Sequence, residues 1–121
     1  MSTRDITGAD FDTLVEENDI VLVDFWASWC GPCRQFAPIY EKASAQHEDV
    51  VFAKMDTEAE VDFATAAQIN AIPTLMAFRE GVLVFNQAGA LPPPALEQVI
   101  QAVKDLDMDE VRAKMQAQTE T

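Results

Sequence analysis

Residues 23–33 read VDFWASWCGPC. The run that leads into them, Ile20–Trp26, is apolar at nearly every position and too short for a helix, so it predicts a strand buried on both faces. Gly31-Pro32 then breaks the chain and begins a helix. This stretch therefore predicts a buried strand followed by two cysteines, Cys30 and Cys33, at a helix N-terminus.

Signals for strands and helices alternate along the rest of the chain, without internal repeats or a low-complexity linker. The first half reads strand-helix-strand-helix-strand, which favours parallel pairing, and the second half adds a hairpin and a covering helix. The prediction is an α/β fold, a three-layer α/β/α sandwich on a mixed sheet. The expected strands are Thr3–Ile6, Ile20–Trp26, Val50–Asp56, Thr74–Arg79 and Val82–Phe85. The expected helices follow Thr7, span Gly31–His47 and Val61–Gln68, and begin after Pro94.

The length of 121 residues is that of a single domain. We assign residues 1–105 to this domain and residues 106–121 to a polar C-terminal extension. Val111 and Met115 lie four residues apart, so the extension is expected to be partly helical, frayed, and without chemistry of its own.

The net charge is −13, from 8 basic and 21 acidic residues. A nucleic-acid-binding protein needs a basic surface to neutralise phosphates, and an anionic membrane attracts basic segments, so the charge argues against both partners. No apolar run approaches the roughly 18–20 residues that span a bilayer, and no secretory signal is recognisable at the N-terminus. The chain is therefore expected to be cytoplasmic. We also expect it to be a monomer.

The cysteine pair carries the chemistry that the sequence predicts. At a helix N-terminus, free N–H groups and the helix dipole favour a thiolate, so Cys30 is expected to attack a substrate disulfide. Cys33, one turn further and more buried, is expected to resolve the mixed disulfide. The alternatives are a zinc site, a structural disulfide and a pair of inert thiols. A closed zinc site needs four ligands, whereas the chain offers two thiols and a distant His47, which is expected on the surface.

Residues 23–33 resemble the active-site signature of the thioredoxin family. Ala37-Pro38, Ile72-Pro73-Thr74 and Gly89-Ala90 match further family segments, and the resemblance runs in order from about residue 6 to residue 103. It implies the thioredoxin fold, a five-stranded mixed β-sheet flanked by four α-helices. It also implies a protein-disulfide reductase that supports cell redox homeostasis through its cysteine pair and binds no cofactor or metal. The implied partners are thioredoxin reductase and disulfide-containing client proteins.

The resemblance further implies roles for residues around the cysteines. Asp24, a carboxylate within an apolar strand, would have a raised pKa and carry protons to and from Cys33 through water. Lys54 would modulate Asp24, and Pro73 would be a cis-proline beside the disulfide. The alternatives are a structural Asp24, a solvated strand-edge Lys54 and an ordinary trans Pro73. The substrate-binding residues would be Trp29, Gly31, Pro32, Ile72, Thr74, Gly89 and Ala90.

Two other functions fit the same fold: a thiol oxidant or disulfide isomerase, and a redox-independent binding module that uses the same docking surface. Gly31-Pro32 favours the reductant, because in the family it accompanies a low reduction potential, roughly −270 mV for thioredoxin against about −120 mV for the oxidant DsbA. Arg34 stands where the family more often has lysine, and little change is expected because the charge is kept. Glu58, Glu60 and Asp62 are expected to form a solvated face.

Overall fold

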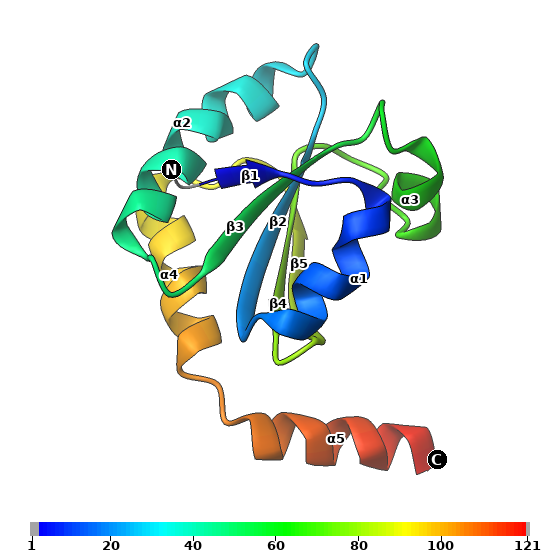
Figure 1. The fold of residues 1–121 in the computed structure, drawn as a ribbon. Helices are drawn as coiled ribbons and strands as arrows, with labels where there is room; N and C mark the ends of the chain where they lie inside the picture. Colours follow the sequence, from blue (N-terminus) through cyan, green and yellow to red (C-terminus); the bar gives the residue numbers. More distant parts are fainter. Residues whose placement is uncertain (1–2, 121) are drawn as a thin grey trace.

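A computed structural model describes residues 3–120 of the chain (Figure 1). Five strands form one mixed sheet in the order β1-β3-β2-β4-β5, in which β1, β2 and β3 run parallel and β4 runs antiparallel to both of its neighbours. The strands are β1 (Thr3–Asp5), β2 (Ile20–Trp26), β3 (Val51–Asp56), β4 (Thr74–Arg79) and β5 (Val82–Ala88). The helices are α1 (Gly8–Glu17), α2 (Gly31–Gln46), α3 (Val61–Ala66), α4 (Pro93–Lys104) and α5 (Met108–Glu120).

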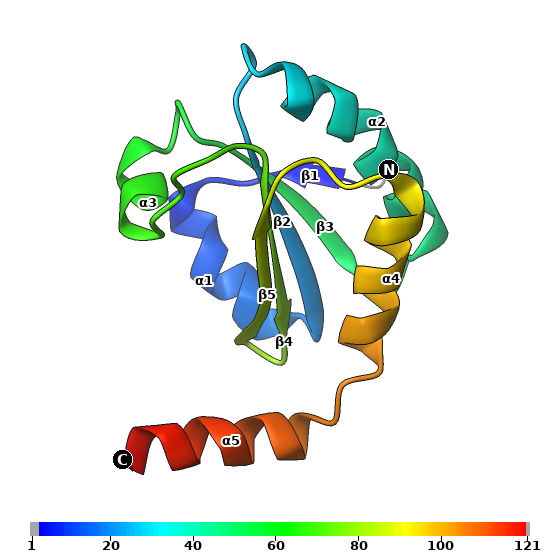
Figure 2. The ribbon, with the colours of Figure 1, turned by 180° about the vertical axis from the view of Figure 1, so that it is seen from behind.

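Helices cover both faces of the sheet (Figure 1 and Figure 2). The helices α1 and α3 lie on one face, and α2 and α4 lie on the other. The alternation of side chains along β2 explains this arrangement, because Leu22 packs into the α2/α4 core while Val21 and Val23 pack into the α1/α3 core. All three residues are fully buried. The predicted three-layer sandwich and the burial of this strand on both faces are therefore confirmed.

Local sequence signals begin two of the helices. Thr7 caps α1: its hydroxyl accepts the N–H of Asp10 at 3.3 Å, and the Asp10 carboxylate accepts the N–H of Thr7 at 3.1 Å. The helix α4 begins at Pro93 rather than after Pro94, which corrects the predicted start. The fixed φ angle of proline suits the first helical turn, where the N–H has no partner within the helix.

Two segments differ from the prediction near the end of the chain. The strand β5 continues to Ala88, past the predicted end at Phe85, because its last residues pair with β4. The extension forms a fifth helix, α5, in addition to the four that flank the sheet. This helix is attached to the body at its start, since Met108 is only 5% exposed and Arg112 forms an ion pair with Glu80. The start of the extension is therefore packed rather than frayed.

His47 is buried, which corrects its expected place on the surface. Only 7% of the residue is exposed. Its Nε2 atom lies 2.5 Å from Oε1 of Glu97, and its Nδ1 atom lies 2.9 Å from Nζ of Lys104. Both partners belong to α4, 50 and 57 residues further along the chain, so the polar neighbours of His47 in the sequence gave no sign of this contact.

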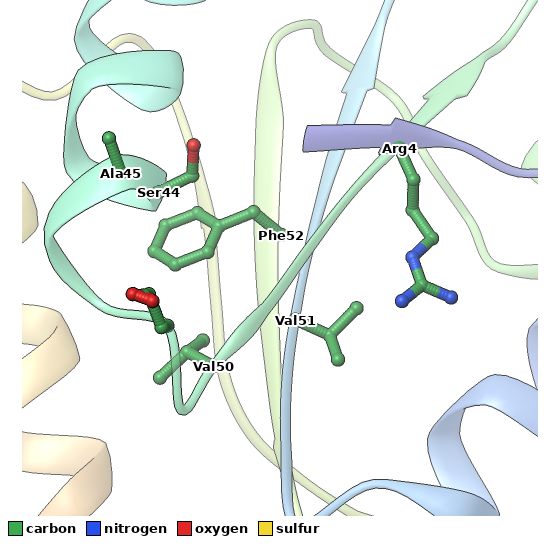
Figure 3. Close-up of a pocket in the computed structure, with 7 residues that line it drawn as sticks. Arg4, Ser44, Ala45, Val50, Val51 and Phe52 are labelled. Carbon is green, nitrogen blue, oxygen red and sulfur yellow. The ribbon is translucent and has the colours of Figure 1, made fainter. Parts of the chain in front are cut away.

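A surface hollow of about 500 Å³ lies between the end of α2 and the edge of the sheet (Figure 3). Ser44 and Ala45 of α2, Phe52 of β3 and Arg4 of β1 are among the residues that line it. The cysteines lie at the opposite end of α2. The hollow is therefore separate from the site that the cysteines define.

Candidate active site

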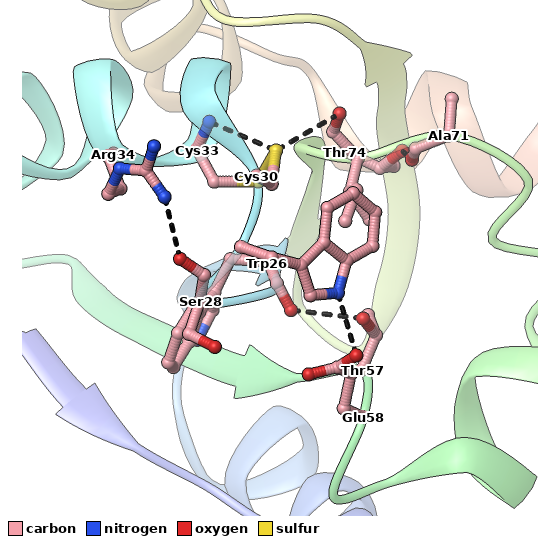
Figure 4. Close-up of a disulfide and its surroundings, with 11 residues drawn as sticks. Trp26, Ser28, Cys30, Cys33, Arg34, Thr57, Glu58, Ala71 and Thr74 are labelled. Atoms are coloured by element: carbon pink, nitrogen blue, oxygen red, sulfur yellow. Dashed lines mark hydrogen bonds between the residues drawn. A yellow bond between two sulfur atoms is a disulfide. The ribbon is translucent and has the colours of Figure 1, made fainter.

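The cysteine pair lies where the chain passes from β2 to α2. Cys30 is the N-cap of α2, Cys33 lies in its first turn, and the two form a disulfide with their Cα atoms 5.2 Å apart. The Sγ atom of Cys30 accepts the N–H of Cys33 at 3.2 Å (Figure 4). A sulfur in this position is stabilised as a thiolate once the disulfide is reduced. The geometry therefore supports Cys30 as the attacking sulfur.

The two cysteines are almost equally buried, with 4% of Cys30 and 3% of Cys33 exposed. The greater burial expected for Cys33 is not present in the disulfide form. Their surroundings differ instead. The Cys30 sulfur lies 3.7 Å from the carbonyl oxygen of Ile72, whereas Cys33 lines a pocket together with Asp24. The first cysteine thus borders the proline loop, and the second borders a buried carboxyl.

Asp24 lies on β2 and lines this pocket, which has a volume of about 110 Å³. Only 1% of the residue is exposed, and neither carboxylate oxygen has a hydrogen-bond partner among the described residues. Burial disfavours the charged form and raises the pKa of Asp24 to about 7, while the positive charge of Lys54 lowers it in part. A carboxyl with this pKa can both give and take a proton near neutral pH. The pocket is large enough to hold water.

Lys54 lies beside Asp24 in the sheet, because β3 pairs with β2 in a register that places these two residues opposite each other. Its Nζ atom is 5.2 Å from the centroid of the Trp26 ring, and the residue is half-buried. An indole face attracts a cation at this distance. Lys54 therefore lies over Trp26 on an inner strand, and the alternative of a solvated strand-edge lysine does not describe it.

The loop around Pro73 lies next to the cysteines. The Ile72–Pro73 peptide bond is cis, as the family resemblance implies. The N–H of Gly89 donates to the carbonyl of Pro73 at 2.8 Å, which brings the Gly89-Ala90 loop to the same place. Gly89 has a φ angle of 106°, a conformation that favours glycine. Two segments far apart in the sequence therefore meet beside Cys30.

The predicted substrate-binding residues differ in how much of each reaches the surface. Trp29 is 64% exposed. Thr74 is buried, and its hydroxyl donates to the carbonyl of Ala71 at 2.5 Å, so its side chain is not part of the surface. Among the others, Pro32, Gly89 and Ala90 are exposed, and Gly31 and Ile72 are half-buried.

Glu58 and Asp62 are exposed, as expected of a solvated face, whereas Glu60 is half-buried, and two of these acids have specific partners. Glu58 accepts the indole N–H of Trp29 at 2.7 Å, and Glu60 accepts the backbone N–H of Gly8 at 2.8 Å. The partners are 29 and 52 residues away in the sequence, so no local pattern indicates them. One signal was present: parallel strands end at the same edge of a sheet, which brings residues after β3 close to residues after β2.

Within residues 3–120, no three side chains of His, Cys, Asp or Glu are grouped so that they could hold a metal ion. In the same part of the chain, no helix is both long and apolar enough to cross a membrane. The chemistry that the arrangement can perform is thiol–disulfide exchange. It offers a sulfur at a helix N-terminus, a second sulfur that bonds to it, and a carboxyl with a pKa of about 7 in the pocket that the second cysteine lines.

Comparisons with known proteins agree with this chemistry. A sequence model of the thioredoxin family matches residues 2–102. The Streptomyces coelicolor protein named "Putative thioredoxin 2" is 55% identical over 120 residues, which cover 97% of this chain and 90% of that protein. Thioredoxin-1 of Saccharomyces cerevisiae is 39% identical over 102 residues, 84% of this chain and 98% of that protein. A mutant thioredoxin from Halobacterium salinarum superposes with a TM-score of 0.81 at 32% identity, covering 88% of this chain and 94% of that one.

Proposed function

Because this chain belongs to the thioredoxin family and is a protein-disulfide reductase, we propose that it acts as a general reductant of client proteins, with Cys30 as nucleophile and Cys33 as resolving thiol. The observation that carries the assignment is the place of Cys30 as the N-cap of α2, where its sulfur accepts the N–H of Cys33 at 3.2 Å. The helix terminus favours the thiolate of Cys30 and so selects it for the first attack.

The first step forms a mixed disulfide. The Cys30 thiolate attacks one sulfur of a client disulfide, the client S–S bond breaks, and the other client sulfur leaves as a thiolate that takes up a proton. In the second step, Cys33 loses its proton and attacks Cys30. The bond between Cys30 and the client breaks, and the second client sulfur leaves. The client has gained two electrons and two protons, and the cysteine pair has become the disulfide.

Asp24 is the proton acceptor that we propose for Cys33. The carboxyl and the thiol line the same pocket, and the pKa of about 7 allows Asp24 to exchange a proton at the pH of the cell interior. The pocket has room for water between the two groups, so the proton can pass through a bridging water. Lys54 favours the charged form of Asp24 and so limits how far burial raises its pKa.

The client is proposed to bind over the surface formed by Trp29, Gly31, Pro32, Ile72 and the Gly89-Ala90 loop. This surface surrounds Cys30 and is mainly apolar. The Ile72 carbonyl lies 3.7 Å from the Cys30 sulfur, so an extended client peptide beside the disulfide can pair with main-chain groups of Ile72 and Thr74. Binding through the main chain suits a reductant that serves many clients.

The cellular setting is also part of the proposal. We infer a cytoplasmic monomer that carries electrons from a thioredoxin reductase to its clients, with no resident cofactor beyond the Cys30–Cys33 disulfide. The net charge of −13 keeps the chain soluble and makes basic clients and a basic docking face on the reductase the favoured partners. We assign this function to residues 1–105, with residues 106–121 as an extension.

The reduction potential of the Cys30–Cys33 couple tests the proposal. The protein is equilibrated with a dithiol buffer of varied ratio, and the fractions with free and paired thiols are separated by alkylation and mass spectrometry. A value near −270 mV is expected for a general reductant. A value above about −200 mV would place the chain with the oxidants and isomerases and overturn the proposal. Full function after replacement of both cysteines by serine would instead favour the binding module.

A further inference from the structure

Arg34 is exposed, and its side chain has a specific hydrogen-bond partner in the active-site loop. It follows Cys33 directly in α2, and its Nη1 atom donates to the carbonyl oxygen of Ser28 at 2.9 Å (Figure 4). The bond spans the active-site loop, from the segment before Cys30 to the helix after it. The sequence predicts only a preserved positive charge at this position. The structure adds a specific anchor for that charge.

Arg34 also lines the pocket that contains Cys33 and Asp24. The wall of this pocket holds two cations, Arg34 and Lys54, and a single carboxyl, Asp24. The remaining lining residues are neutral: Trp26, Ala27, Ser28 and Ala37. The resolving thiol therefore faces a pocket in which positive charge outnumbers negative charge when Asp24 is ionised.

The two cations are related to different members of the proton-transfer pair, Lys54 through the sheet register and Arg34 through the pocket it shares with Cys33. Lys54 is the sheet neighbour of Asp24, and its charge is the one that lowers the pKa of that carboxyl. Arg34 is the chain neighbour of Cys33 in the first turn of the helix. Proton transfer from the Cys33 thiol to the Asp24 carboxylate moves one negative charge from the carboxyl to the sulfur. A cation nearer the sulfur favours that movement, and a cation nearer the carboxyl opposes it.

We propose that Arg34 is a positioning residue for the resolving step: its bond to Ser28 anchors the side chain at the pocket that it lines with Cys33, where its charge stabilises the Cys33 thiolate. This inference rests on the proposed function. The proton leaves the Cys33 sulfur for Asp24, directly or through water, and the thiolate attacks the Cys30 sulfur as the client sulfur leaves. Arg34 takes no proton itself. It changes the fraction of Cys33 that is ionised in the mixed disulfide.

The bond to Ser28 distinguishes Arg34 from a freely moving surface cation. A flexible lysine on a helix surface spreads its charge over many conformations. A guanidinium that is hydrogen-bonded to a carbonyl keeps its charge in one place while other N–H groups remain free. Arginine and lysine are therefore expected to differ at this position, although both carry the same charge.

The test compares Arg34→Gln, Arg34→Lys and the matched control Lys42→Gln, which removes an exposed charge further along the same helix. Each reduced protein reacts with excess disulfide peptide from pH 5 to 9, and rapid acid quenching with mass spectrometry gives the mixed-disulfide fraction over time. In Arg34→Gln, the mixed disulfide is expected to be resolved about fivefold more slowly at pH 6–7, and the pH midpoint of the resolving rate should rise. Much of this difference from the wild type should disappear in 1 M salt. Arg34→Lys should recover part of the rate, and Lys42→Gln should match the wild type.

A second measurement separates an effect on Cys33 from one on Cys30. Alkylation of Cys30 by iodoacetamide across the same pH range is compared between Cys33→Ser and the double variant Cys33→Ser/Arg34→Gln. The proposal expects the same alkylation profile for both. The proposal would be overturned if Arg34→Gln resolved the mixed disulfide at the wild-type rate. It would also be overturned if the pH profile of Cys30 alkylation shifted as much as that of the resolving rate. Failure of the wild type to reduce the peptide would instead contradict the proposed function, which keeps the two outcomes distinct.

Discussion

The two ends of the molecule differ in whether their buried polar groups have hydrogen-bond partners. At the redox end, both carboxylate oxygens of Asp24 and the indole nitrogen of Trp26 are buried without a hydrogen-bond partner among the described residues. At the opposite end, both ring nitrogens of His47 have partners, Glu97 and Lys104. A buried polar group without a partner is destabilising, whereas a paired one is stabilising or close to neutral.

Arg79 extends the contrast at the far end. It lies at the end of β4, and its Nη1 atom donates to the carbonyl oxygens of Val103 at 2.7 Å, Lys104 at 3.1 Å and Leu106 at 3.4 Å. These carbonyls lie at the end of α4 and just beyond it, where helical carbonyls lack partners within the helix and a cation interacts favourably with the dipole. The buried polar groups named at the far end thus have partners, whereas the buried carboxyl at the redox end has none among the described residues.

The largest expected effect is loss of turnover on removal of either cysteine. Cys33→Ser should trap a covalent client adduct at Cys30, because the resolving thiol is gone, whereas Cys30→Ser should trap none. Mass spectrometry of each variant after incubation with a disulfide peptide measures the adduct. The adduct of Cys33→Ser should release the peptide on treatment with a small dithiol. Adducts at Cys33 in the Cys30→Ser variant at a comparable rate would show that the two roles are reversed.

Asp24→Asn would remove the unpaired charge at the redox end. The folded protein holds the Asp24 proton up to a pKa of about 7, whereas the unfolded chain releases it near the ordinary value of 3.8. Stability of the wild type should therefore fall as pH rises from 4 to 7 and then level off. The full shift corresponds to up to about 4 kcal/mol, at 1.36 kcal/mol per tenfold change in the acid dissociation constant. The asparagine variant should lack this slope and be more stable at pH 8.

Urea unfolding of wild type and Asp24→Asn at pH 4, 6 and 8 measures this difference, and the mixed-disulfide assay at pH 7 measures the matching loss of rate. Equal stability at pH 8 would show that the carboxyl is satisfied by contacts such as bound water. A resolving rate equal to that of the wild type would remove Asp24 from the proton transfer. Gained stability with a slower resolving step would show that the unpaired carboxyl serves the reaction at the expense of the fold.

A smaller effect is expected at the far end. Arg79→Gln removes a charged donor from three carbonyls and should lower the free energy of unfolding by about 2 kcal/mol. The rate of client reduction should stay unchanged, because Arg79 lies at the other end of β4 from the proline loop. Urea unfolding and a disulfide-peptide assay on the same sample check both statements. A lower rate of client reduction in Arg79→Gln would show that the far end and the redox end are coupled.

Sequence patterns were sufficient to predict the bounds of elements that are marked by their own residues. The strands Ile20–Trp26 and Thr74–Arg79 agree with the prediction at both ends, because apolar runs of strand length are bounded by residues that end a strand. The cysteine pair at the start of α2 follows from Gly31-Pro32. The cis geometry of Pro73 came from the family resemblance and not from spacing.

What the sequence could not provide were contacts between residues far apart in the chain. The burial of His47 depends on α4, and the role of Arg79 depends on carbonyls that only the packed helix end presents. The bond between Arg34 and Ser28 is closer in sequence, yet it requires the turn of the active-site loop. Polar residues are assigned to the surface by default when only their neighbours are known, and each of these exceptions is a polar residue with a distant or loop-dependent partner.

The place of α5 determines how the protein can be attached to a solid support. This helix lies at the end of the molecule opposite the cysteine loop at the start of α2 (Figure 1 and Figure 2). A linker joined after α5 would hold the molecule with its disulfide facing the solution, and Met108 and Arg79 would fix the base of the linker to the body. Beads or electrodes coated in this orientation would present a uniform layer of accessible disulfides, whereas coupling through Lys42 or Lys54 would turn part of the population toward the support.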